Sequence, residues 1–168
     1  MGSRGRLDSL RTWLTGVSGV AAVEFALVLP LLMVLSFGFL EIGRLFWIYH
    51  IANASVRDAA RYGARLSLSC QNGVSTMPNP QAVATLARTG TIDGSAPDLV
   101  PGWSSGPPVL VRVGCVGNAN LRGAYAGVTQ IPVVTVTARV PFTPLFGGLI
   151  PGMQIEGLNV SHQEAWTG

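Results

Sequence analysis

A continuous apolar run near the N-terminus constrains this chain more than any other feature of its sequence. From Val20 to Leu40 the sequence reads VAAVEFALVLPLLMVLSFGFL, and Glu24 is the one ionisable residue in it. A helix of about 20 apolar residues crosses a hydrocarbon core of about 30 Å. Only 11% of all residues are charged, against about a quarter in soluble domains. The run therefore predicts a single transmembrane helix over residues 20–40.

The helical pattern continues beyond this run. After Leu40 the sequence is no longer apolar throughout, but apolar and small residues recur at helical spacing as far as Gly63. We therefore expect one helix over residues 20–66, which is about 70 Å long at about 1.5 Å per residue. A bilayer needs about half of that length. The second half must project into water, where another part of the chain has to cover its apolar face.

The remaining residues, 67–168, predict a small α+β domain. The segment PQAVATLAR follows Asn79, a suitable N-cap, and precedes Gly90, a suitable helix end, so it predicts a short helix inside a region of loops. Runs rich in β-branched residues predict strands at 109–116, 132–140 and 155–163. In the second run valine alternates with threonine and arginine, which indicates one packed and one wet face. The predicted fold is a long helix lying on a small antiparallel sheet.

Charge and cysteine usage indicate the orientation of the chain. Arg4, Arg6 and Arg11 precede the span and are opposed only by Asp8, which favours a cytoplasmic N-terminus. Further arginines follow the span, so charge alone does not decide the topology. These are Arg44, Arg57, Arg61 and Arg65.

The only two cysteines, Cys70 and Cys115, both lie beyond the span. They predict one disulfide in an oxidising compartment, either periplasmic or extracellular, with two free thiols as the alternative.

A short motif marks the start of the apolar run. Gly19 is followed by Val20, Ala21, Ala22, Val23, Glu24 and Phe25, behind a basic leader. A charged residue at membrane depth costs about 2.5 to 3.5 kcal/mol on insertion scales, so Glu24 is expected to have a role or a partner. The motif resembles the processing site of type IV prepilins. The resemblance implies that a prepilin peptidase cuts between Gly19 and Val20, which makes residues 1–19 a leader and Glu24 the fifth residue of the mature chain.

A longer stretch carries a more specific resemblance. Residues 19–64 resemble the N-terminal region of TadE-like proteins, the pseudopilins of tight-adherence pilus systems, and residues 134–152 are similar to the terminal region of that family. This resemblance implies a minor pilin or pseudopilin of the bacterial inner membrane, with its C-terminal domain in the periplasm. The implied partners are the prepilin peptidase, other pilins and pseudopilins, and the pilus assembly platform. Incorporation into an extracellular pilus stays open.

Other function classes find less support in the residues. The two histidines, His50 and His162, lie in no nucleophile, metal or phosphate motif, so the chain is not expected to be an enzyme or to need a cofactor. The net charge of +3 comes from arginines gathered around the apolar run, which does not indicate nucleic-acid binding. The alternative is an unprocessed signal-anchored protein, either a periplasmic binding module or an enzyme, that uses the helix only as a tether.

Overall fold

The structure is a computed structural model, and it describes residues 18–71, 74–119, 123–146 and 157–167. Its elements confirm the α+β class. The helices are α2 (Ser18–Ala64) and α3 (Pro80–Thr89), with short 3-10 turns at η1 (Trp103–Ser105) and η2 (Gly123–Tyr125). The strands are β1 (Ser69–Gln71), β2 (Val74–Thr76), β3 (Leu110–Gly117), β4 (Gln130–Val140) and β5 (Leu158–Ala165).

The chain divides into two compact units. The first is Met1–Ile42 with Leu145–Gly152, and the second is Gly43–Pro144 with Met153–Gly168. Within the described residues, the first unit consists of the N-terminal half of α2 and the pair 145–146. The second unit contains the rest of α2, both sheets and α3.

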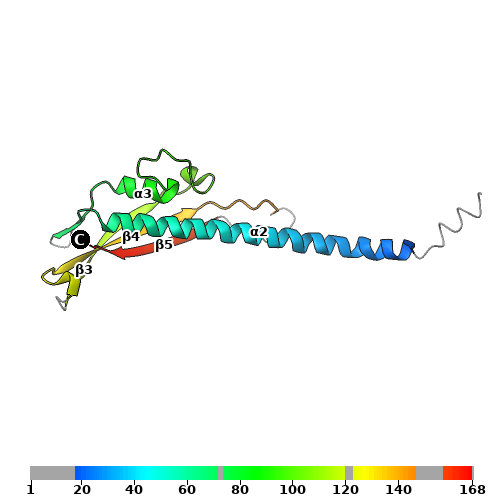
Figure 1. Ribbon diagram of the computed structural model, residues 1–168, viewed down its shortest axis with the longest axis horizontal. Helices are drawn as coiled ribbons and strands as arrows, with labels where there is room; N and C mark the ends of the chain where they lie inside the picture. The colour runs from blue at the N-terminus through cyan, green and yellow to red at the C-terminus, as the bar shows by residue number, and fades with distance from the viewer. Residues whose placement is uncertain (1–17, 72–73, 120–122, 147–156, 168) are drawn as a thin grey trace, which may run out of the picture. The chain divides into compact units, whose positions relative to one another are not determined.

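The long helix forms as its sequence predicts. α2 is a single helix of 47 residues that continues through Pro30 without a break and is drawn as one uninterrupted ribbon (Figure 1). Its observed ends lie two residues from the expected ones. A proline inside a membrane helix is tolerated because neighbouring groups can satisfy the carbonyl that it leaves without a donor.

The second unit is built around a three-stranded antiparallel sheet in the order β3-β4-β5, with β4 in the middle (Figure 1). Along β4 the residues alternate between buried and half-buried, as the valine and threonine pattern predicts. The outer face is polar, and the hydroxyls of Thr137 on β4 and Ser161 on β5 lie 3.0 Å apart on it. Residues 155–156, where the third predicted strand was expected to begin, lie outside the described residues.

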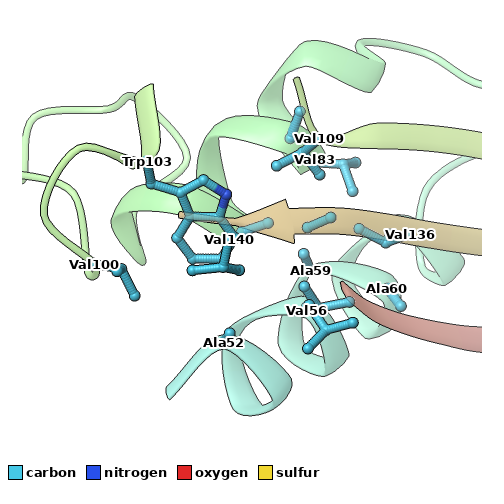
Figure 2. Close-up of a cluster of buried hydrophobic side chains, with 14 of the residues drawn as sticks. Ala52, Val56, Ala59, Ala60, Val83, Val100, Trp103, Val109, Val136 and Val140 are labelled. Carbon is cyan, nitrogen blue, oxygen red and sulfur yellow. The ribbon is translucent and has the colours of Figure 1, made fainter. Parts of the chain in front are cut away.

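The C-terminal half of α2 packs against the inner face of this sheet. Figure 2 shows Val56, Ala59 and Ala60 of α2 facing Val136 and Val140 of β4, all with no exposed surface. From Val56 onward, three of the four fully buried apolar side chains on this helix are alanines, so the backbone can approach the sheet closely. These are Ala59, Ala60 and Ala64. This packing supplies the cover that the projecting half of the helix was expected to need.

The short helix α3 closes the core on another side. The side chain of Asn79 accepts a hydrogen bond from the backbone N–H of Ala82 at 3.2 Å. Gly90 ends the helix with φ of 75°, a conformation that favours glycine. Between these two caps, Val83 and Ala87 are fully buried in the same cluster as Trp103 of η1. Figure 2 shows Val83 and Trp103 in one cluster with Val136 and Val140 of β4.

One element was not expected from the sequence. β1 and β2 form an antiparallel hairpin in the region predicted to be loops, with Gln71 paired to Val74. The intervening residues 72–73 are Asn-Gly, the usual sequence signal for a two-residue hairpin connection. The prediction of loops was wrong here because strands of three residues each are too short to show an alternating pattern.

Candidate functional site: the N-terminal helix and its junction with the domain

The predicted processing residues lie at the start of α2. Gly19 and Val20 are in its first turn, and a Cβ built on Gly19 meets nothing within 4 Å. Val20 is 70% exposed. Backbone N–H groups in the first turn of a helix have no partner inside it. Among the described residues, none packs against the Cβ position of Gly19, and the side chain of Val20 is largely exposed.

The N-terminal half of the helix presents an apolar surface all around its circumference. Its most apolar window has a mean hydropathy of 2.4, and none of that window is buried within the chain. A helix that is apolar on every side needs lipid or other helices as its surroundings. The large side chains that it exposes include Val23, Phe25, Leu27, Leu31, Leu35, Phe39 and Leu40.

Glu24 and Phe25 lie within this apolar surface, and both are exposed. In the part of the chain that the structure describes, Glu24 makes no hydrogen bond or ion pair. In lipid this carboxyl group carries the insertion cost expected from the sequence.

A second acidic residue, Glu41, was not singled out from the sequence. Its side chain is 2% exposed, and its Oε2 accepts hydrogen bonds from the backbone N–H groups of Leu145 at 3.1 Å and Phe146 at 3.3 Å. One turn earlier on α2, Phe37 stacks on Phe146 with ring centroids 4.7 Å apart. The sequence did carry a signal, because Glu41 is the first ionisable residue after the apolar run.

In the second unit, Arg44 binds the segment that precedes Leu145. Its guanidinium donates a hydrogen bond to the carbonyl oxygen of Thr143 and lies 4.7 Å from the ring centre of Phe142. Phe142 itself is buried. Arg44 was interpreted from the sequence as a charge flanking the membrane, and the structure adds a defined contact to that interpretation.

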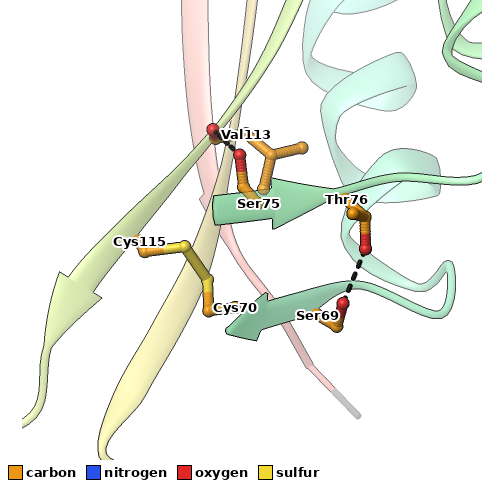
Figure 3. The surroundings of a disulfide bond; sticks show 6 residues. All are labelled: Ser69, Cys70, Ser75, Thr76, Val113 and Cys115. Carbon is orange, nitrogen blue, oxygen red and sulfur yellow. Dashed lines mark hydrogen bonds between the residues drawn. A yellow bond between two sulfur atoms is a disulfide. The ribbon is translucent and has the colours of Figure 1, made fainter. Parts of the chain in front are cut away.

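The structure joins Cys70 and Cys115 in a disulfide across a sequence separation of 45 residues. It links β1 to β3, as Figure 3 shows, and beside it the hydroxyl of Ser75 on β2 donates to the carbonyl oxygen of Val113 at 2.7 Å. A covalent bond and a hydrogen bond thus help to attach the hairpin to the main sheet. The disulfide predicted from the two cysteines is present.

Comparison with protein-family models gives a match, which lies within α2. Residues 19–61 match the family of TadE-like proteins. This confirms the resemblance seen in the sequence over that segment, while the similarity of residues 134–152 to the family lies outside the match. Comparisons with curated proteins and with solved structures found no significant match. The matched segment covers most of α2, from Gly19 to Arg61. It includes Glu24, Glu41 and Arg44.

The matched residues lie in α2, which is long and apolar enough to cross a membrane by its length and composition. Among the described residues, no group of three or more histidine, cysteine, aspartate and glutamate side chains could hold a metal ion. His162 pairs with Glu164 of the same strand at 3.1 Å. His50 and His162 lie on different elements, α2 and β5.

Proposed function

We propose that this chain is a minor pilin or pseudopilin that takes part in the initiation, priming or capping of a tight-adherence pilus. The observation that carries the proposal is the exposed apolar half of α2 inside a TadE-like segment, continuous with a half that packs on a folded domain. Such a helix can stay in lipid before assembly and pack with other pilin helices afterwards.

In this proposal the chain is made as an inner-membrane precursor with its N-terminus in the cytoplasm and residues 67–168 in the periplasm. The disulfide between Cys70 and Cys115 supports an oxidising compartment for the domain. A prepilin peptidase removes the leader, residues 1–19, and Val20 becomes the new N-terminus. The assembly platform then brings the helix against those of partner pilins.

Glu24 has a defined role in this sequence of events. Cleavage creates an α-amino group at Val20, which needs a partner once an apolar assembly surrounds it. The carboxyl group of Glu24 from a neighbouring subunit can neutralise that amine and so fix the axial register of the two helices. Phe25, 60% exposed beside it, adds apolar contact at the same level.

The position of the mature N-terminus tests the processing step. Mass spectrometry of N-terminal peptides from membrane fractions should recover Val20 as the first residue in cells that make the peptidase. Gly19→Leu should block cleavage, whereas Gly43→Leu is a matched control, since a Cβ at either glycine meets nothing within 4 Å. Recovery of residue 1 or 2 as the dominant N-terminus of the native chain would leave the uncleaved tether as the better description.

The assembly step is tested by Glu24→Ala and Glu24→Gln. Both variants should insert as well as the native chain or better, because a costly charge leaves the span. Cleavage should continue in both, while pili should be lost. Glu24→Gln keeps the size of the side chain and therefore separates charge from shape. Normal pilus numbers with normally processed Glu24→Ala protein would remove Glu24 from the mechanism.

A further inference from the structure

The corner formed by Leu145 and Phe146 lies against a part of α2 that belongs to the apolar run. Its anchoring residue Phe37 is about 26 Å from Val20 along the helix axis at about 1.5 Å per residue. A hydrocarbon core is about 30 Å thick. If Val20 marks one boundary of the core, Phe37 is still inside it near the far boundary, and Glu41 is at the interface.

The corner has the chemistry that this depth requires. Leu145 is 69% exposed although it is apolar, and Phe146 turns its ring to Phe37 of the span. Placing the corner in lipid would be unfavourable if its two backbone N–H groups had no acceptor, because an unsatisfied N–H in lipid costs several kcal/mol. Glu41 accepts a hydrogen bond from both of them.

We infer that the Leu145–Phe146 corner is a second membrane-contact site of this chain, which inserts into the outer lipid layer beside α2 while Glu41 satisfies its backbone. The occupant of its exposed face is the bilayer, because the corner is continuous with the helix surface whose mean hydropathy is 2.4. Glu41 acts as a positioning residue for the corner. The inference requires that α2 spans a membrane, and it is independent of cleavage and of pilus assembly.

The charged residue that follows supports this location. Arg44 lies one turn beyond Glu41 and binds the carbonyl oxygen of Thr143, two residues before Leu145. A guanidinium with a long apolar stem is suited to the headgroup level. Of the two residues whose backbone N–H groups donate to Glu41, only Leu145 keeps a largely exposed side chain, and that side chain is apolar.

The test measures the depth of single labelled positions in the full chain. Leu145→Cys, Phe39→Cys and Leu110→Cys are each labelled with bimane after reconstitution into vesicles of phosphatidylethanolamine and phosphatidylglycerol that contain nitroxide-labelled lipids. The native cysteines are paired and do not react. Phe39, on α2, is 73% exposed and reports lipid, and Leu110, on β3, is 47% exposed and reports an apolar site on the sheet.

We expect bimane at position 145 to be quenched as strongly as at position 39, and bimane at position 110 to stay unquenched. The quenching at 145 should persist when the protein is diluted with excess lipid. Absence of quenching at 145 would overturn the inference. So would protection from quenching that grows with protein density, because a second copy of the chain would then cover the corner.

The role of Glu41 is tested in the same labelled chain. Glu41→Ala removes the acceptor and should reduce quenching at position 145 while leaving position 39 unchanged. Glu41→Gln retains an oxygen that can accept from the same two N–H groups and should preserve the quenching at 145. Equal depth of position 145 in native and Glu41→Ala chains would refute the positioning role. The labelled chain with native Glu41 decides the membrane contact even where Glu41→Ala fails to fold.

Discussion

The packing of α2 on the sheet predicts opposite outcomes for one substitution at two places on this helix. Ala59 has no exposed surface and lies on the face of α2 that packs against β4, whereas Ala54 is exposed on the same helix. Leucine adds three carbon atoms, and their burial would stabilise by about 0.8 kcal/mol each if space existed. Ala59 is fully enclosed by its neighbours, so Ala59→Leu should destabilise the domain by about 1 to 3 kcal/mol through overpacking.

Ala54→Leu is the matched control. It should change the free energy of unfolding by less than about 0.5 kcal/mol, because position 54 is exposed and both alanine and leucine favour helix. The assay is hydrogen exchange of the β4 peptide, measured by mass spectrometry on the full chain in detergent. A loss of 1 to 3 kcal/mol corresponds to exchange that is about 5- to 150-fold faster. Equal exchange rates in the two variants would refute the argument that alanines set the distance between α2 and the sheet.

Two further predictions concern the disulfide and the turn at Trp103. Replacing Cys70 and Cys115 together with serine opens a cross-link over 45 residues and should lower the free energy of unfolding by about 4 kcal/mol; an unchanged urea midpoint in detergent would contradict this. Hydrogen bonds from the hydroxyl and then the backbone N–H of Ser104 hold the pKa of Asp98 below its ordinary value of 3.8. The pKa is lower in the folded state, so this stabilisation is complete above the unfolded value and is lost as pH falls through the folded one. Local protection of the turn at Trp103 should therefore fall below about pH 4, and Asp98→Asn should remove that pH dependence; an identical pH profile in Asp98→Asn would contradict it.

The sequence predicts best where the signal is local. The apolar run and the helical spacing after it are enough to place α2, because a long helix satisfies its own backbone hydrogen bonds. Asn79 and Gly90 are enough to place α3, since both caps act within one turn of the helix. The alternation of valine and threonine places β4 and identifies its buried face.

The candidate site divides in the same way. Gly19, Val20 and Glu24 form a continuous motif, so their spacing could be read along the chain, and the family match later covered the same residues. Their roles in processing and assembly stay predictions. Glu41 could not be assigned a partner in advance, because the N–H groups that it accepts from are 104 and 105 residues away in the sequence.

By itself, then, the sequence determined that this protein has one apolar helix long enough to cross a bilayer and to continue beyond it. It also determined which face of the central strand is buried, since side-chain periodicity follows from backbone geometry alone. Only the tertiary structure decided which residues cover the second half of the helix and what the buried carboxyl group of Glu41 binds. Those contacts join distant segments, and no local pattern records which partners meet when the chain folds.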